Sequence, residues 1–233
     1  MEAGLASALR PMNEKAKKFS DSSSPLLAPA PWELKGIGII LVYKFSKEWV
    51  EKQSHLPDYL KGKFKGGLGY LMLVSYENSP VGAYHELLLI PGKFSPENKQ
   101  SITKIYVDSK DSTFNGRANW GIPKKTLPFS WTEDQGKTSI QVSSNGKSIF
   151  DCSIKSFGIP FPASTNLLPI DLHQFWEGKD FFTRPSGRGR GKLVKVKINH
   201  IDTSYFPDVR GQRLLLGVKI NPFQIEFPKP KDA

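Results

Sequence analysis

The sequence has one cysteine, four histidines and no apolar run long enough to cross a membrane. A single cysteine cannot form a disulfide within the chain, which fits a reducing compartment, and we expect the cytoplasm. Cys152 lies in the apolar pattern SIFDCSIKSF, which favours a packed core thiol over a reactive one. Metal-ligand spacing is absent from the histidines, so we expect no metal site; they are His55, His85, His173 and His200.

Acidic residues are scarce: 22 Asp and Glu stand against 33 Lys and Arg, a formal charge of +11 over 233 residues. Such an excess attracts nucleic acid, anionic lipid or acidic small molecules. The strongest basic run, RPSGRGRGK at 184–192, lacks interleaved aromatic residues and a following helix, which favours a solvated loop over a nucleic-acid site. We therefore expect a basic surface around a site for a small anionic substrate, with neither nucleic acid nor membrane as a partner.

Residues 1–28 show no apolar periodicity. Their start lacks the apolar centre of a secretory signal, and Glu2 and Glu14 argue against an organelle transit peptide, although its amphipathic character leaves that alternative open. The stretch SDSSSPLLAPAP is typical of a linker. We predict a flexible tail over 1–28 and one domain over 29–233.

Turn-forming residues are abundant, with 20 glycines and 18 prolines spread along the chain, and this indicates many short elements. A helix is expected at 46–53 after Ser46, and another at 110–121, capped by Asp108 or Ser109 and ended by Gly121. Asn-Gly in SSNGKS predicts a type I′ hairpin turn. The fold class is mainly β (α+β), with strands expected at 32–45, 69–77, 81–92, 101–109, 127–133, 137–144, 147–156, 192–202 and 213–227.

Lys124 and Lys125 stand side by side in the most aromatic and proline-punctuated stretch, GRANWGIPKKTLPFSW. One interpretation is two solvated lysines on a surface turn. The other is a lysine that forms a Schiff base, which requires an unprotonated amine. Burial among apolar groups such as Trp120, or a second nearby cation, lowers the pKa of a lysine. On an extended chain neighbouring side chains face opposite ways, so we expect burial to act on Lys124 while Lys125 faces elsewhere.

The segment GRANWGIPKKTL resembles the active-site segment of the acetoacetate decarboxylase family, in which Gly-Arg precedes Pro-Lys-Lys. In this chain these positions are Gly116, Arg117, Pro123, Lys124 and Lys125. The resemblance implies that Lys124 forms the imine with Lys125 as its companion, a device for which acetoacetate decarboxylase itself is the standard example. It also implies a closed, cone-like antiparallel β-barrel or double sheet with flanking helices, and a large homo-oligomer.

A second stretch, GAYHE, resembles the Gly-x-Tyr-x-Glu of the same family and carries it onto Gly82, Tyr84 and Glu86. The resemblance implies that Glu86 is an acid/base or orienting group beside the lysine. Since Glu86 lies in a very apolar strand, a carboxylate at a strand edge is the alternative interpretation. We expect its neighbour His85 to be structural, because it faces the other side of the strand.

Three departures from the family pattern concern the polar shell. The glutamate that usually follows Gly-Arg is Ala118 here, and a second acidic position falls at about Leu71. An arginine of the first strand, which would meet the substrate carboxylate, has no clear match, and Lys35 is the nearest cation. These departures weaken acetoacetate as the substrate more than they weaken imine chemistry.

The function we expect is a lyase that decarboxylates a β-keto acid or related oxo acid through a Schiff base on Lys124, a reaction that needs no cofactor. Glu86 is expected to share the catalysis, with Lys125, Arg117, Tyr84, Trp120 and Lys35 as pocket or supporting residues. Two alternatives remain open: a β-barrel that binds an apolar or keto ligand without turnover, and an aldolase or dehydratase that uses the same imine. A basic nucleic-acid-binding domain is a third hypothesis, marked by loss of affinity with rising salt.

Overall fold

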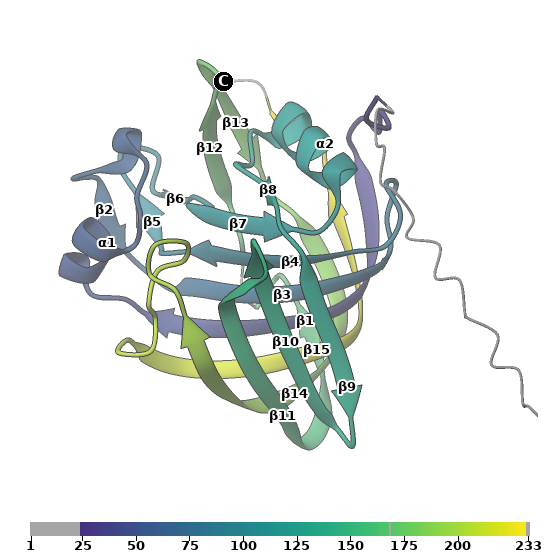
Figure 1. The fold of residues 1–233 in the computed structure, drawn as a ribbon. Coiled ribbons are helices and arrows are strands. Elements are labelled where there is room, and N and C mark those ends of the chain that lie inside the picture. Colours follow the sequence, from purple (N-terminus) through teal and green to yellow (C-terminus); the bar gives the residue numbers. More distant parts are fainter. Residues whose placement is uncertain (1–23, 168, 232–233) are drawn as a thin grey trace, which may run out of the picture.

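The structure, a computed structural model, describes residues 24–167 and 169–231. Figure 1 shows a strongly curled sheet of long strands with short elements gathered around one end. The helical elements in this part of the chain are α1 Lys47–Gln53, the 3-10 helix η1 Asp58–Leu60 and α2 Lys110–Trp120. The strands are β1 Trp32–Lys44, β2 Phe64–Gly66, β3 Gly69–Asn78, β4 Tyr84–Ile90, β5 Lys93–Phe94, β6 Lys99–Gln100, β7 Lys104–Val107, β8 Lys125–Thr126, β9 Phe129–Asp134, β10 Lys137–Ser144, β11 Lys147–Ser164, β12 Leu172–Trp176, β13 Lys179–Thr183, β14 Ser186–Ile201 and β15 Arg213–Phe227.

Two sheets are formed by these strands. The ten-stranded sheet has the order β8-β7-β4-β3-β1-β15-β14-β11-β10-β9, and the five-stranded sheet has the order β13-β12-β6-β5-β2. The edge strands β8 and β9 of the large sheet are not paired with each other, so the sheet is a curled half-barrel. The predicted mainly β fold, with a double sheet and a few short helices, is confirmed.

The strands at the centre of the large sheet are buried on both faces. On β3, Leu71 and Leu73 pack into a core shared with α1, β10 and β11. The alternate residues Tyr70 and Met72 pack into a second core, which also holds residues of α2 and the segment after it. Because successive side chains of a strand point to opposite faces, one apolar run serves both cores.

Several local predictions are confirmed. Ser46 and Ser109 accept hydrogen bonds from the backbone N–H groups of Trp49 and Ser112, which caps α1 and α2. Gly121 ends α2 in the left-handed conformation, with φ of 62°. The hairpin turn between β10 and β11 has positive φ at both Asn145 and Gly146.

The basic run at 184–192 was expected to be a solvated loop, and this prediction is wrong. Most of it belongs to β14, which pairs with β15 and β11. Its alternate glycines are pressed against neighbouring strands: a Cβ on Gly189 would lie 2.5 Å from Pro222 O, and one on Gly191 would lie 2.9 Å from the Phe161 ring. Glycine alternates with Arg or Lys along this run, and this period of two is typical of a strand that has one crowded face.

Cys152 is buried in the first core, as predicted. Burial, with a smaller contribution from Asp151, raises the pKa of its thiol to about 12. A thiolate is the nucleophilic form, so this side chain acts as a small apolar group.

The expected tail over 1–28 lies mostly outside the described residues, and only 24–28 can be placed. These residues run along α2, where Leu26 N–H donates to Asp111 Oδ1 at 3.0 Å and Ala28 N–H donates to Asn115 Oδ1 at 2.8 Å. The Trp32 indole N–H donates to Ala28 O at 2.8 Å. The segment just before the predicted domain start is thus attached to α2 by hydrogen bonds.

The strands of the five-stranded sheet were not among those predicted individually from the sequence. The hairpin β12–β13 turns at Glu177 and Gly178, both with positive φ, and α2 lies close to β13 (Figure 1). Among the described residues, none of the helices is long and apolar enough to cross a membrane.

Candidate active site

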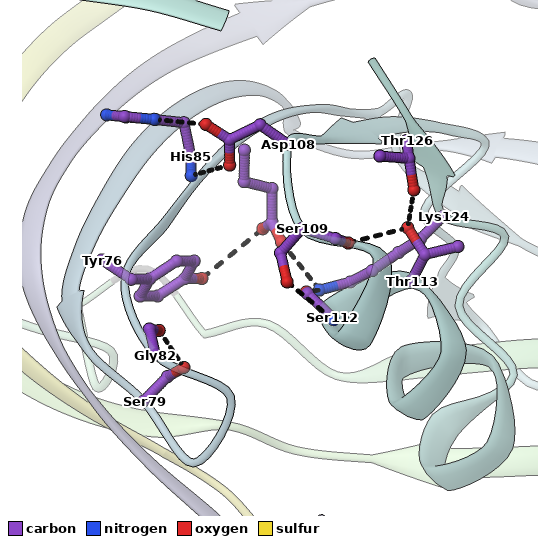
Figure 2. A network of polar contacts seen from close by, with 11 residues as sticks. Tyr76, Ser79, Gly82, His85, Asp108, Ser109, Ser112, Thr113, Lys124 and Thr126 are labelled. Atoms are coloured by element: carbon purple, nitrogen blue, oxygen red, sulfur yellow. Dashed lines mark hydrogen bonds and ion pairs between the residues drawn. The ribbon is translucent and has the colours of Figure 1, made fainter. Parts of the chain in front are cut away.

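The two lysines of the opening pair face different surroundings. Lys124 is 4% exposed, whereas Lys125, the first residue of β8, is exposed and pairs with Tyr106 of β7. The expectation that neighbouring lysines face opposite ways is confirmed. The hydroxyl groups of Thr113 and Thr126, 2.8 Å apart, fasten α2 to β8 directly after the pair (Figure 2).

The Lys124 ammonium has three buried neighbours. Its Nζ donates to Glu86 Oε2 at 3.0 Å and to Ser112 Oγ at 2.9 Å, the latter contact visible in Figure 2. The Tyr84 ring centroid lies 5.1 Å from Nζ, within reach of a cation–π contact. Tyr76 adds a long hydrogen bond of 3.5 Å from its hydroxyl to Glu86 Oε1.

Two regular elements hold these neighbours in place. Tyr84 and Glu86 are two residues apart on β4, so they share the face of the sheet that packs toward α2. Ser112 and Gly116 are four residues apart on α2 and both contact the Lys124 side chain. Spacing of four residues places two side chains on one face of a helix.

The charge state of the pair differs from the prediction. Burial, the largest influence, lowers the pKa of Lys124, but the Glu86 carboxylate and Tyr84 raise it, and the net result lies above the usual 10.5. Burial acts on Lys124 as expected, but the contact with Glu86 outweighs it, so the resting pair favours an ammonium on Lys124 rather than a neutral amine. Burial also raises the pKa of Tyr84, partly opposed by Lys124, so the phenol keeps its proton.

A cavity of about 370 Å³ opens beside this pair on the α2-facing side of the large sheet. Glu86 and Tyr76 line it, and Lys124 sits directly behind Glu86. Apart from Glu86 and Arg188, the lining side chains carry no charge. The cavity thus places one buried carboxylate, backed by a buried ammonium, at the wall of a mostly apolar space.

The other residues expected at the site have separate places. Arg117 donates through Nε to Lys124 O at 2.9 Å, and also through Nη2, while its guanidinium lies 5.3 Å from the Trp176 ring centre. It therefore fixes the backbone of Lys124 and lines a different depression of about 670 Å³ on the outer side of α2. The structure brings Arg117 to the lysine but not into the cavity beside Glu86.

Three more expected residues lie away from the Lys124 amine. Trp120 is a core residue, packed edge-on against Trp32 with ring centres 5.1 Å apart. Lys35 is an exposed residue of β1 opposite Gln224 of β15, and Lys125 is exposed on β8. None of the three lines the cavity beside Glu86.

The departures from the family pattern have a spatial explanation. Leu71 is fully buried in the first core, on the opposite face of β3 from the cavity, so an acid at this position would not face Lys124. Val74 stands directly across from Glu86 on the cavity side. Ala118 is exposed on the outer side of α2, where a glutamate would not meet the cavity either.

Three site residues were missed from the sequence. Ser112 could have been found, because its spacing of four from Gly116 of the Gly-Arg motif places it on the same helix face. Tyr76 could have been found from the pairing of β3 with β4, where it stands across from Tyr84. Nothing in the sequence placed Arg188 beside the cavity, because the basic run around it was predicted to be a solvated loop.

His85 lies on the other side of β4, as expected for a structural residue. Its ring Nδ1 is 2.7 Å from Asp108 Oδ2, and its backbone N–H donates to Asp108 Oδ1 (Figure 2). The ring stacks on Trp131 with centres 5.6 Å apart. This contact joins β4 to β9 across the curled sheet.

Comparison with known proteins gives a family match and a distant curated relative. The family described as acetoacetate decarboxylase (ADC) matches residues 18–158. Over 109 residues the chain is 27% identical to Protein NEOXANTHIN-DEFICIENT 1 of Arabidopsis thaliana, a match that covers 44% of this chain and 37% of that protein. The chain thus spans little more than a third of the length of this relative.

Solved structures share the fold over nearly the whole chain. Acetoacetate decarboxylase from Legionella pneumophila superposes with a TM-score of 0.65 and 12% identity, covering 98% of both chains. The enduracididine biosynthesis enzyme MppR, complexed with pyruvate, superposes with a TM-score of 0.61 and 12% identity, covering 96% of this chain and 98% of its own. At such low identity the likeness is one of fold.

Proposed function

Because the chain belongs to the acetoacetate decarboxylase family, we propose that it decarboxylates a β-keto acid or related oxo acid through a Schiff base on Lys124. The observation that carries the proposal is the buried pair of Lys124 and Glu86, 3.0 Å apart, in which Glu86 lines the 370 Å³ cavity and Lys124 lies behind it. A buried amine with one carboxylate partner beside a mostly apolar cavity is an arrangement that suits imine chemistry.

The first step frees the amine. Lys124 begins as an ammonium, and its hydrogen bond to Glu86 provides a direct path for one proton to pass to the carboxylate. The neutral amine then attacks the keto carbon and forms a carbinolamine. Glu86 returns the proton to the leaving hydroxyl group, water departs, and the protonated imine remains.

The second step breaks the carbon–carbon bond. Electrons of the bond to the carboxylate move into the protonated imine, carbon dioxide leaves, and an enamine forms. Protonation of the enamine carbon restores the imine, and water then releases the ketone and the free lysine. The Glu86 carboxylate stabilises the cationic imine, while Ser112 and Tyr84 hold its nitrogen in place.

Two of the expected residues, Arg117 and Lys125, lie outside the cavity. We assign Arg117 to positioning, because it grips Lys124 O and leaves the cavity to Glu86. Lys125 lies outside the cavity on β8, so we expect it to be dispensable for imine formation.

Borohydride trapping tests the proposal. The protein is incubated with a keto acid or a methyl ketone, reduced, and examined by peptide mass spectrometry. Mass should be added at Lys124 alone. Lys124→Arg should abolish trapping, because a guanidinium stays protonated. Lys125→Gln is the matched control and should trap like the unaltered protein; label spread over surface lysines would contradict the assignment.

The same imine can support other reactions of oxo acids. Aldol addition and dehydration both begin with the enamine or imine that decarboxylation uses. MppR, which shares this fold, is described as complexed with pyruvate, an oxo acid. Product analysis with a β-keto acid and with pyruvate plus an aldehyde distinguishes carbon dioxide release from carbon–carbon bond formation.

Binding without turnover is the second candidate. It is favoured by the raised pKa of Lys124 and by the position of its amine behind Glu86 rather than on the cavity surface. In that case Lys124 serves only to neutralise a buried carboxylate. Folded protein that binds a methyl ketone yet yields no trapped adduct with any carbonyl compound would support this candidate over the enzyme.

We also propose a homo-oligomer in the cytoplasm. Large apolar side chains are exposed on two long strands: Phe157 and Ile159 on β11, and Leu214, Leu215 and Leu216 on β15. Ile159 is 84% exposed, so a partner copy would remove a large apolar surface from water. Sedimentation of the purified protein should show a species larger than 26.1 kDa, which Ile159→Glu should shift toward the monomer.

A further inference from the structure

We propose that the cavity beside Glu86 takes an oxo compound with a long apolar chain, its carbonyl group toward Glu86 and Lys124 and its chain along the sheet. The assignment of a carbonyl group to the polar end of the ligand depends on the proposed imine chemistry. The assignment of a long apolar chain to the ligand depends only on the shape and lining of the cavity. The proposal therefore names a substrate class well beyond a four-carbon oxo acid.

The walls of the cavity are apolar on several strands. On β3, Met72 and Val74 face it, and β15 contributes Leu216, Val218 and Ile220. These residues alternate along their strands, so the surface arises from the period of two and extends across the sheet. Apolar walls gain free energy only when an apolar group displaces water, and the gain scales with the area covered.

The volume favours a long ligand. Water occupies roughly 30 Å³ per molecule in the liquid, so about 370 Å³ corresponds to about a dozen water-sized groups. Acetoacetate, with seven heavy atoms, would leave on the order of half of this space unfilled. A small, doubly polar ligand would also find few polar partners on the walls, which makes burial costly.

The two charged lining residues lie at different depths. Glu86 is 5% exposed, whereas Arg188 of β14 is exposed. Four strand steps separate β4 from β14, on the order of 19 Å along the curled sheet. The cavity therefore runs from a buried polar end to an exposed one, with apolar walls between, which suits an elongated ligand.

Gly38 offers a direct way to shorten the cavity. It lies on β1 among the lining residues, and an added Cβ would meet only the Phe223 ring, at an ordinary 3.5 Å. A side chain at this position would project into the cavity without straining the backbone. Gly38→Leu should therefore fill part of the space while leaving the fold intact, since Leu is no worse than Gly in a strand.

The experiment is a chain-length series of methyl ketones, from acetone through 2-heptanone to 2-tridecanone, trapped with cyanoborohydride on the full-length protein. The apparent affinity should rise by about three- to fourfold for each added methylene until the cavity is full. Gly38→Leu should bring that limit down by about four carbons, the size of the added side chain. Gly211→Leu, at a glycine with open space around it, is the matched control and should leave the series unchanged.

A second measurement separates this inference from the proposed function. Displacement of 1-anilinonaphthalene-8-sulfonate is followed with each ketone and with the 2-alkanol of the same length, which cannot form an imine. If the affinity of both the ketones and the alkanols rises with chain length but no adduct is trapped, the apolar-chain inference is supported and the proposed imine chemistry is contradicted. If acetone and 2-undecanone are trapped equally well, the apolar-chain inference is wrong while the imine chemistry is supported. The same conclusion follows if Gly38→Leu leaves the trapping of every ketone unchanged.

Geranylacetone, a branched isoprenoid ketone with thirteen carbons, is compared with the linear 2-tridecanone. Preference for either assigns the chain to an isoprenoid or a fatty-acyl source. If neither ketone binds more tightly than acetone, the apolar-chain assignment is wrong.

Discussion

A Cβ added to Gly116 would lie 2.7 Å from Cδ of Lys124 and 2.9 Å from its Cε. Glycine at this point of α2 therefore lets the lysine stem lie directly against the helix, and this contact aims the amine at Glu86. The Gly-Arg motif thus has two mechanical roles. Gly116 makes room for the stem, and Arg117 holds the backbone carbonyl of the same lysine.

Gly116→Ala should impair trapping without unfolding the protein. Alanine is favoured over glycine within a helix by up to about 1 kcal/mol, so the free energy of unfolding should stay level or rise. The methyl group should displace the lysine stem, and misplacement by about 1 Å can cost two orders of magnitude in rate. Trapping rates and chemical denaturation are measured together. Gly211→Ala, in open space, is the control, and equal trapping by both variants would show that the stem contact is unimportant.

The fold was largely readable from the sequence because most of its signals are local. Ser46 and Ser109 are good caps, Asn145-Gly146 is a good turn, and the opposite facing of Lys124 and Lys125 follows from extended backbone alone. Each of these depends on the residues of one short segment. Their agreement with the structure reflects consistency between local preference and fold.

The charge state of the site could not be read in this way. The pKa of Lys124 depends on Glu86, 38 residues away in the chain, and on whether their side chains meet at hydrogen-bonding distance. The sequence supplied burial, which lowers the pKa, but not the contact that outweighs it. The position of Arg188 beside the cavity could not be predicted from the sequence either, because it results from the pairing of β14 with β15.

Replacing Lys124 alone should destabilise the protein, contrary to the idea that removing a buried lysine relieves strain. Lys124→Met leaves the Glu86 carboxylate buried without its cation, and breaking a buried ion pair typically costs about 3–5 kcal/mol. The double variant Lys124→Met/Glu86→Leu should recover most of this loss, because both charges are gone. Denaturant unfolding of the four proteins of the cycle measures the coupling. Single and double variants of equal stability would mean that water reaches the pair.

The destabilisation should also depend on pH. In Lys124→Met, acid can protonate the orphaned carboxyl group and remove the buried charge. The difference in unfolding free energy from the unaltered protein should therefore shrink as the pH falls from neutrality. A difference that stays constant would place the cost in packing rather than in charge.

The folded domain is proposed to begin before residue 29. Truncation of residues 1–28 removes the contacts that Leu26 and Ala28 make with Asp111 and Asn115, whereas truncation of residues 1–23 keeps them. Hydrogen bonds of this kind contribute about 1 kcal/mol each, so the longer truncation should unfold a few degrees lower. Thermal unfolding of both proteins provides the comparison. Identical midpoints would make residues 24–28 part of a dispensable tail.

Glu86→Gln should lower the pH at which trapping reaches half its maximum, and the unaltered protein provides the reference.

In the unaltered protein the pKa of Lys124 is raised, so the folded state holds this proton more tightly than the unfolded chain does. The stabilisation from the pair is then complete below the ordinary lysine value of 10.5 and is lost only as the pH rises above it. Between about pH 6 and pH 9, unfolding free energy should not vary through Lys124, and trapping should still be rising at pH 9.

Glu86→Gln removes the charge that raises the pKa of Lys124 and leaves burial, which lowers this pKa. The midpoint of the trapping rate against pH should therefore fall, while its plateau also falls because the proton carrier is gone. The rate of adduct formation with a methyl ketone is followed by intact mass across the pH range. Glu77→Gln, at an exposed position on β3, is the matched control. A profile that keeps its midpoint in Glu86→Gln would mean that Glu86 does not govern the proton on Lys124, and the proton transfer assigned to this pair would have to be abandoned.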